Sequence, residues 1–365
     1  MREINVSTNE AGQRLDKLLR KYLKNANTSF IYKMLRKKNI VLNDKKAEGK
    51  EILNLGDSVK MYFSEETFAT MTRRTGQNSG SAETNRAAAA NASAQTASAG
   101  KNSAQMRRGA SSGNSSERRD QRAFDVEGFR KHIVYEDENL LVLNKPSGWL
   151  SQSDGSGLPS VNERCLQYLL ATGTLTEAQL QTFKPGIANR LDRNTSGLIL
   201  FGKTLPALQA LAGLLRDRTM EKYYLAIVCG DIDHAQRIDG YLTKDERTNR
   251  VEIRPQPFPD AVEIHTAYEP LKGSDDYTVL KVHLITGKTH QIRAHLRAIG
   301  HPIIGDPKYG RKDANAYYRT HGGVKSQLLH AWELHFPKTL DGPLRNLADQ
   351  TITADPPKDF RLFLK

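Results

Sequence analysis

The stretch "NRLDRNTSGLILFGKT" covers residues 189–204 and joins a charged loop to an apolar run. The run "LILFG", bounded by polar and turn residues, predicts a buried strand. Directly before it, Asp192 stands between Arg190 and Arg193. In an extended loop Arg190 and Asp192 project to one side and Leu191 anchors the other. The neighbouring cations favour an ionised carboxylate, which suits a nucleophile or a base and not a proton donor.

The charges of this loop have a plain alternative explanation. Exposed Asp–Arg pairs are common on loops and stabilise little, so an idle surface salt bridge stays open on this stretch alone. A standard glycosidase needs a second carboxyl group, and none lies close to Asp192 in the sequence. A partner carboxylate from a distant part of the chain stays open as well.

Length and composition predict a cytoplasmic protein of two domains. At 365 residues the chain exceeds the size at which one core usually keeps growing. No segment approaches the ~20 apolar residues of a membrane span, and the N-terminus "MREINVSTNE" lacks the apolar core of a signal peptide. Cys165 and Cys229 are too few and too far apart for a disulfide framework or a metal cluster, so we expect two buried thiols.

The chain is strongly basic. Its 54 Lys and Arg exceed its 41 Asp and Glu by 13, which favours a polyanionic partner over an ordinary solvated surface. Residues 70–122 carry nine Lys and Arg against three Asp and Glu, in a stretch of small and polar residues that cannot bury a core. We therefore expect a disordered basic linker at 70–122, between a domain at 1–69 and a larger domain at 123–365.

Two short basic helices are predicted in the first domain. Leucines between Leu15 and Leu23 recur at helical spacing, and a second helix, capped by Thr28, turns Ile31 and Met34 inward. A strand and turn at "NIVLNDKKAEG" and a strand after the turn in "LNLGDSVKMYF" complete a compact module. Basic residues share its surface and are candidate phosphate contacts: Arg14, Lys17, Lys33, Arg36, Lys37 and Lys38.

These segments resemble the RNA-binding domain named after small-subunit ribosomal protein S-four. The residues that carry the resemblance are "GQRLDKLLRKYLKN", "TSFIYKMLRKKNIVLNDKK" and "LNLGDSVKM", within residues 12–63. The resemblance implies that the helix pair binds structured RNA. A basic helical adaptor for protein partners is the alternative that the residues alone leave open.

The second domain is predicted to be a mixed α+β sheet domain with flanking helices. Strands are expected at "LLVLNKPSGWLSQS", "SGLILFGKT", "EKYYLAIVCG", "VEIHTAYEPL", "YTVLKVHLIT" and "LLHAWELHF", and an amphipathic helix at "LPALQALAGLLRDR". Strands outnumber helices and lack the strict alternation of a doubly wound fold. No Gly-rich phosphate loop, Walker sequence or dinucleotide fingerprint occurs, so we expect no nucleotide cofactor.

The segment "GKTHQIRAHLRAIGHP" predicts a two-faced helix with Thr289 as its N-cap and Gly300 at C′. Its packing face holds Ile292, His295, Leu296 and Ile299, and its cationic face, ready for phosphate or base, holds His290, Arg293 and Arg297. His290 and His295 lie on different faces with no Cys or carboxylate beside them. We therefore expect no metal site and a core position for His295.

In this order, "NRLDRNTSGLILFGKT", "EKYYLAIVCG" and "LITGKTHQIRAHLRAIGHPIIGDPKYG" closely resemble the RluA-type pseudouridine synthases, and "VLNKPSG" upstream fits the same pattern. The resemblance covers about residues 130–340 and makes an idle salt bridge at Asp192 a poor explanation. It implies isomerisation of uridine in RNA: the N-glycosidic bond breaks, the detached uracil turns, and a carbon-glycosidic bond forms. It also implies that no cofactor or metal is needed.

By position in these motifs, the resemblance implies roles for four residues. Asp192 would be the essential carboxylate that acts at the ribose, and Arg190 would fill the space that the flipped uridine leaves. Tyr224 would pack on the target base and assist proton transfer, and Arg293 would pair with Asp192. On the residues alone, Tyr224 could also be a core strand residue and Arg293 a phosphate contact. The family often has histidine where this chain has Asn189, which cannot titrate, so we assign no proton-carrying role there and still expect activity.

We therefore expect an RNA pseudouridine synthase that works as a monomer, bound to RNA and to no membrane. The RNA-binding appendage and the family favour large-subunit (23S) ribosomal RNA over transfer RNA. The alternative is an RNA-binding ribosome-assembly factor on the same scaffold, with catalysis lost or secondary. The target uridine stays open, and so does the step at Asp192: attack on the ribose carbon, removal of a ribose proton, or attack on the base.

Overall fold

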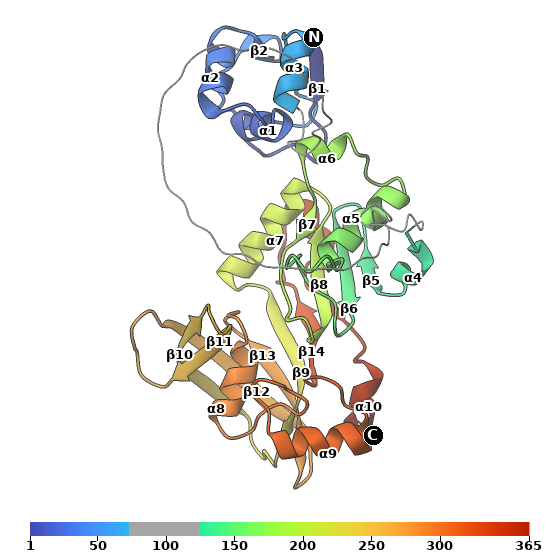
Figure 1. Cartoon of the computed structure of the whole chain (residues 1–365), viewed down its shortest axis with the longest axis vertical. Helices are drawn as coiled ribbons and strands as arrows, with labels where there is room; N and C mark the ends of the chain where they lie inside the picture. The colour runs from blue at the N-terminus through green and yellow to red at the C-terminus, as the bar shows by residue number, and fades with distance from the viewer. Residues whose placement is uncertain (73–123, 365) are drawn as a thin grey trace, which may run out of the picture. The chain divides into compact units, whose positions relative to one another are not determined.

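The structure is a computed structural model that describes residues 1–72 and 124–364 (Figure 1). The linker expected at 70–122 lies outside the described residues, apart from 70–72. Those three residues end helix α3 (Glu65–Thr72), so secondary structure continues past the boundary expected at residue 69. None of the helices in the described ranges is long and apolar enough to cross a membrane.

Residues 1–72 form a small module of helices on a four-stranded antiparallel sheet with strand order β1-β4-β2-β3. Its elements are β1 (Arg2–Asn5), α1 (Leu15–Tyr22), α2 (Thr28–Arg36), β2 (Ile40–Leu42), β3 (Lys45–Lys46), β4 (Ser58–Met61) and α3. The two predicted helices and the predicted strands β2 and β4 are confirmed, while β1 and α3 were not predicted. Asn43 and Asp44 both have positive φ, as a tight two-residue hairpin turn requires.

The start of α2 differs from the prediction. Asn27, not Thr28, is the N-cap: its side-chain oxygen accepts a hydrogen bond of 2.8 Å from the backbone N–H of Phe30. Asn and Thr are both favourable N-cap residues. The path of the preceding loop decides which of the two adjacent residues caps the helix, and composition does not specify that path. The apolar faces pack as predicted, with Leu18 and Ile31 fully buried.

Residues 124–364 form a mixed sheet of eleven strands with helices around it, which confirms the predicted α+β class (Figure 1). The strand order is β11-β10-β12-β13-β9-β14-β8-β6-β5, with β15 beside β14 and β7 beside β8. The strands are β5 (Ile133–Glu136), β6 (Leu140–Lys145), β7 (Gly186–Ile187), β8 (Ser196–Gly202), β9 (Glu221–Cys229), β10 (Gln236–Asp245), β11 (Arg250–Arg254), β12 (Val262–Gly273), β13 (Tyr277–Leu284), β14 (Leu329–His335) and β15 (Thr351–Thr353). The helices are α4 (Val126–Arg130), α5 (Val161–Ala171), α6 (Gln179–Thr182), α7 (Leu205–Asp217), α8 (Gln291–Ala298), α9 (Lys312–Gly322) and α10 (Arg361–Leu364), with 3₁₀ turns at Gly342–Leu347 and Lys358–Phe360.

The strands predicted from apolar runs are all present, and three of them form the centre of the sheet. β14 pairs antiparallel with β9 and parallel with β8, and every residue of β8 is buried. Gly197 makes the close approach of β8 to β14 possible, because a Cβ there would lie 2.1 Å from the backbone oxygen of Ala331. The loop before β8, which carries Asp192, therefore enters the middle of the sheet.

The core is built around residues of the apolar strands, whereas a hairpin missed by prediction is largely polar. Side chains of β6, β8 and β9 form one large apolar cluster, and the thiols of Cys165 and Cys229 are free and buried, as predicted. The hairpin of β10 and β11 was not predicted, because most of its residues are half-buried or exposed and many of them are charged. Pairing of β10 with β12 makes it a strand, and periodicity alone does not reveal that pairing.

Candidate active site

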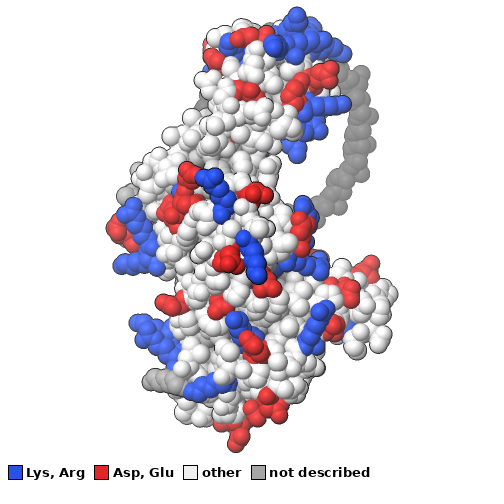
Figure 2. All heavy atoms as spheres, turned by 180° about the vertical axis from the view of Figure 1, so that it is seen from behind, with Lys and Arg blue, Asp and Glu red and all other residues white. Residues whose placement is uncertain are grey.

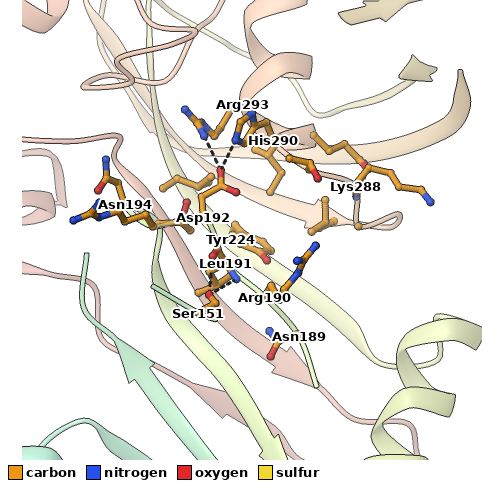
Figure 3. Close-up of a pocket in the computed structure, with 18 of the residues that line it drawn as sticks. Ser151, Asn189, Arg190, Leu191, Asp192, Asn194, Tyr224, Lys288, His290 and Arg293 are labelled. Atoms are coloured by element: carbon orange, nitrogen blue, oxygen red, sulfur yellow. Dashed lines mark hydrogen bonds and ion pairs between the residues drawn. The ribbon is translucent and has the colours of Figure 1, made fainter. Parts of the chain in front are cut away.

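Asp192 lies in the loop between β7 and β8, and the backbone on both sides of it is fixed. Leu191 is buried, and its N–H and carbonyl both bond the hydroxyl of Ser151, at 3.0 and 2.7 Å. On the other side, the carbonyl of Arg193 accepts a hydrogen bond of 2.8 Å from the N–H of Gly148. The carboxylate thus projects from a braced loop, with Leu191 as the predicted anchor (Figure 3).

Lys145, at the end of β6, ties this loop to the turn that follows β6. Its ammonium donates to the carbonyl oxygens of Pro146 and Trp149, each at 3.0 Å, and of Arg193 at 2.9 Å. Three acceptors match the three N–H donors of an ammonium group. Burial lowers the pKa of Lys145 to about 7, although the negative charge of Asp192 acts to raise it. This lysine lies in the motif "VLNKPSG", where the sequence alone indicated no role for it.

Arg293, on α8, pairs with Asp192 in the way that the resemblance implies. Its Nη1 donates to Oδ2 of Asp192 at 2.7 Å (Figure 3). The opposite edge of the guanidinium forms a bidentate pair with Asp306, with Nε to Oδ2 at 2.7 Å and Nη2 to Oδ1 at 2.9 Å. Burial acts to lower the pKa of Arg293, but the two carboxylates outweigh burial and raise it. With two carboxylates on it, Arg293 is not the free phosphate contact that the cationic face of this helix suggested.

Asp306 is a site residue that sequence reasoning missed. It is buried and also accepts hydrogen bonds from the backbone N–H groups of Lys308 and Tyr309, at 2.8 and 2.9 Å. Burial acts to raise the pKa of Asp306, and Arg293 with the two amides lowers it below its ordinary value. Since both of its oxygens are bonded, Asp306 does not supply the second carboxyl group of a glycosidase.

His290 also faces Asp192. Its Nε2 lies 3.8 Å from Oδ2 of Asp192, and its Nδ1 lies 2.9 Å from the hydroxyl of Tyr309. That hydroxyl accepts a hydrogen bond of 3.0 Å from the backbone N–H of Val251, so we assign its own proton to the bond with Nδ1. The ring proton of His290 then sits on Nε2. Burial lowers the pKa of His290 to about 4, so the ring faces Asp192 as a neutral donor at pH 7.

α8 begins one residue later than predicted. Its N-cap is His290 in a left-handed conformation with φ 53°, not Thr289. The side-chain oxygen of Gln291 accepts the backbone N–H of Lys288 at 3.1 Å and so holds the turn that precedes the helix. Gly300, with φ 89°, follows the end of the helix as predicted.

Tyr224, on β9, lines the same pocket as Asp192. It is 7% exposed, and its hydroxyl forms no hydrogen bond with another described residue. Burial, and then the charge of Asp192, raise the pKa of Tyr224 above its ordinary value. The phenol therefore stays protonated at neutral pH, where it can pack on a base and donate a proton.

Asn189 and Arg190 directly precede Leu191 and Asp192 in the loop. Arg190 is exposed at the pocket and forms no ion pair within the described ranges. The side chain of Asn189 bonds the backbone of β8: Nδ2 donates to the carbonyl of Leu198 at 3.2 Å, and Oδ1 accepts from the N–H of Leu200 at 2.8 Å. Asn189 thus joins the loop to the strand, which an amide does without titrating.

The predicted phosphate contacts lie mostly on exposed surface. Figure 2 shows Lys and Arg gathered on the N-terminal module, and the exposed residues near the end of α2 are Lys33, Arg36, Lys37 and Lys38, while Lys17 is exposed on α1. Arg14 differs, since it is half-buried and pairs with Asp16 at 3.0 Å. Arg297 is exposed and donates to the carbonyl of Tyr309 at 3.0 Å. On α8, His295 is buried and bonded to a threonine hydroxyl, as predicted for a core histidine.

Asp192, Tyr224 and Arg293 line one pocket of about 950 Å³. Its cationic lining consists of Arg190, Arg193, Arg218, Lys222, Lys244, Lys288, Arg293 and Lys308, against the two carboxylates Asp154 and Asp192. Such a pocket has room for a nucleotide and a positive potential that attracts a polyanion. Within the described ranges, no three or more His, Cys, Asp or Glu side chains gather in a way that could hold a metal ion.

The arrangement leaves one oxygen of Asp192 free. Arg293 and His290 both face Oδ2 (Figure 3), and no described residue bonds Oδ1. An oriented carboxylate with a free oxygen can attack a carbon or accept a proton. The geometry suits attack on a ribose carbon, removal of a ribose proton and attack on the base alike.

Comparison with known proteins identifies relatives that match nearly the whole chain. A family model described as RNA pseudouridylate synthase matches residues 139–298. "Ribosomal large subunit pseudouridine synthase C" of Vibrio vulnificus is 29% identical over 357 residues, which cover 96% of this chain and 95% of that protein. The protein of the same name from Pasteurella multocida is 30% identical, with 92% and 86% covered. The solved structure of Human RNA Pseudouridylate Synthase Domain Containing 4 matches at a TM-score of 0.51 and 20% identity, over 65% of this chain and 92% of that one, which supports the fold.

Proposed function

The chain belongs to the RNA pseudouridylate synthase family, and we propose that it isomerises uridine in large-subunit ribosomal RNA at the Asp192 pocket. One observation carries the proposal: the carboxylate of Asp192, held by Arg293 at 2.7 Å, stands in a cationic pocket with room for a nucleotide. Relatives that span nearly the whole chain are named ribosomal large subunit pseudouridine synthase C. Their names support large-subunit ribosomal RNA over transfer RNA as the substrate.

The reaction rearranges bonds within one nucleotide. The bond from N1 of uracil to C1′ of the ribose breaks, the base turns, and C5 bonds to C1′; C5 loses a proton and N1 gains one. Asp192 acts on the target nucleotide through its free oxygen, and Arg293 holds it in place. Arg190, exposed and unpaired among the described residues, fills the space in the RNA that the flipped uridine leaves. Tyr224 packs on the base.

The N-terminal module contributes affinity for structured RNA. We assign it to the S-four type, supported by two helices on an antiparallel sheet and by the exposed cations near the end of α2. Contacts to phosphate fix position without reading sequence. We take the RNA-binding domain as 1–72, because α3 continues past the boundary expected at residue 69, the linker as the remainder of 70–122 and the catalytic domain as 123–365. We further propose that the protein acts in the cytoplasm as a monomer, which is consistent with Asp192, Tyr224 and Arg293 lining one pocket of a single chain.

Mapping of pseudouridine across total RNA tests the substrate. Cells without the gene should lack one or a few pseudouridines, all in large-subunit ribosomal RNA, and a copy of the gene should restore them. A signal lost only from transfer RNA would contradict the proposed substrate. An unchanged map together with a defect in ribosome assembly would indicate the RNA-binding assembly factor instead.

A further inference from the structure

Lys222 is a buried lysine without a counter-ion among the described residues. It lies on β9 two residues before Tyr224, so both side chains project from the same face of the strand, and both line the pocket. Lys222 is 9% exposed, and no described residue forms an ion pair or a hydrogen bond with its ammonium. Burial lowers the pKa of Lys222, and the charge of Arg218 lowers it further.

Other buried lysines of this domain are compensated. Lys145 donates to three carbonyl oxygens, and Lys203 pairs with Glu136 at 3.0 Å. Burying a charge without a partner is costly, so such a group is rare unless something outside the chain pairs with it. A partner for Lys222 would therefore come from the pocket that it lines.

Arg218 places a second cation beside Lys222. It ends α7 in a left-handed conformation with φ 58°, a backbone that side chains other than glycine seldom adopt. It lines the same pocket, and no described carboxylate pairs with it. Two like charges that line one pocket and repel each other, with no described carboxylate paired to either, suit an anion.

We propose that Lys222 and Arg218 form a subsite for a backbone phosphate of the substrate RNA, next to the uridine that reaches Asp192. The identity of the anion rests on the proposed function, because a uridine whose ribose reaches Asp192 carries its own phosphates into the same pocket. An ammonium group gives a compact charge with three donors, and a guanidinium gives a planar fork; both are standard partners of phosphate.

Replacing Lys222 should move stability and RNA binding in opposite directions. Lys222→Met removes an uncompensated buried charge and keeps most of the volume, so we expect a higher midpoint of thermal unfolding. The same variant should bind a large-subunit ribosomal RNA fragment about tenfold more weakly. The slope of log affinity against log salt should become shallower by about 0.7 to 0.9, the value of one phosphate contact. Arg218→Gln, an exposed position, should weaken binding and flatten the slope in the same way.

Lys281→Met is the matched control. It removes the same charge from the neighbouring strand β13, but Lys281 pairs with Glu333 at 3.1 Å and lies over the ring of Tyr223. Tyr223 adjoins Tyr224 and projects from the opposite face of β9. The control should leave the salt slope unchanged and should not raise the unfolding midpoint. If Lys222→Met and Lys281→Met have equal effects on the slope, the subsite is wrong.

A neutral linkage in the RNA identifies the phosphate itself. Transcripts carry a methylphosphonate in place of one phosphate, on either side of the target uridine. We expect the methylphosphonate at one of the two positions to weaken RNA binding by the wild-type protein. At that position it should not weaken binding by Lys222→Met, because this variant no longer contacts the phosphate. Equal losses in both proteins at both positions would overturn the subsite. Binding and isomerisation are measured separately, so an RNA that binds through Lys222 without forming pseudouridine would refute the proposed function and leave the subsite standing.

Discussion

Arg293 shares one guanidinium between two carboxylates that stand 114 positions apart in the chain. Its Nη1 meets Asp192 at 2.7 Å, while Nε and Nη2 meet Asp306 at 2.7 and 2.9 Å. Because Asp306 holds two of these donors, the guanidinium cannot rotate, and Nη1 stays aimed at Oδ2 of Asp192. Asp306 therefore acts as a positioning residue for Asp192, although it does not itself reach the substrate.

Asp306→Asn should slow the reaction more than it weakens binding. The amide loses the charge that orients Arg293, and misplacing a reactive group by about 1 Å can cost about a hundredfold in rate. We expect the single-turnover rate at saturating RNA to fall about ten- to a hundredfold. The unfolding free energy should fall by about 2 to 3 kcal/mol, less than for a buried charge left with no partner, because Asp192 still pairs with Arg293.

Asp313→Asn is the control for Asp306→Asn. Asp313 pairs with Arg311 at 2.6 Å on exposed surface, where an ion pair contributes no more than about 1 kcal/mol. This variant should keep the wild-type rate and nearly the wild-type stability. If folded Asp306→Asn also turned over at the wild-type rate, Asp306 would serve stability alone.

At the scale of single residues, the sequence motifs identified the candidate catalytic residues but not the buried charged residues that hold them in place. The structure brings Asp192, Tyr224 and Arg293 into one pocket. It also adds Asp306 and Lys145, which sequence reasoning could not assign. Both are charged residues whose hydrogen-bond partners come from other parts of the fold. Such tertiary contacts cannot be predicted from composition or from the spacing of residues.

At the scale of elements, prediction succeeded where one physical signal dominates. The central strands are buried on both faces, and their continuous apolar runs predicted them. The helix α8 was predicted by its period, but its cationic face was assigned to contacts with phosphate or base. Arg293 on that face is 4% exposed, because two carboxylates replace water around it. Periodicity separates polar from apolar residues. It therefore assigns a charged residue to the exposed face even when a buried ion pair removes that residue from water.

The strand β9 shows how one element serves two purposes. Tyr224 and Lys222 project toward the pocket, whereas Tyr223 stacks against His283 with ring centres 4.7 Å apart. The alternation follows from the period of a strand. The sequence "KYY" could therefore place two of its residues on one face, but not decide which face lines the site.

At the scale of the whole molecule, the basic charge is distributed over parts with different tasks. The pocket of the catalytic domain carries eight Lys and Arg, and the N-terminal module carries exposed cations of its own. Phosphate contacts add affinity and a salt dependence, and they act on every RNA sequence alike. We therefore expect charge changes in the module to alter binding and to leave the chemical step alone.

A fourfold Gln variant at Lys33, Arg36, Lys37 and Lys38 tests this division within the intact chain. The salt slope of RNA binding should become shallower by about 0.7 to 0.9 for each phosphate that the variant no longer neutralises, and by about 3 if all four side chains bind phosphate. The single-turnover rate at saturating RNA should stay within about twofold, because the pocket is unchanged. The matched control replaces the exposed Lys24, Lys45, Lys46 and Lys50 by Gln. An equal loss of affinity in both variants would mean that α2 is no specific binding surface.

The most direct test of the account is the chemistry of Asp192→Asn on a ribosomal RNA transcript that the wild-type protein converts. The amide keeps the shape of the side chain, and Arg293 keeps its pair with Asp306, so the fold and the pocket should persist. We expect affinity for the RNA within about threefold of wild type and no detectable pseudouridine in a single-turnover assay, because the charge that must react is gone. Conversion at a rate near wild type would remove Asp192 from the mechanism and contradict the account.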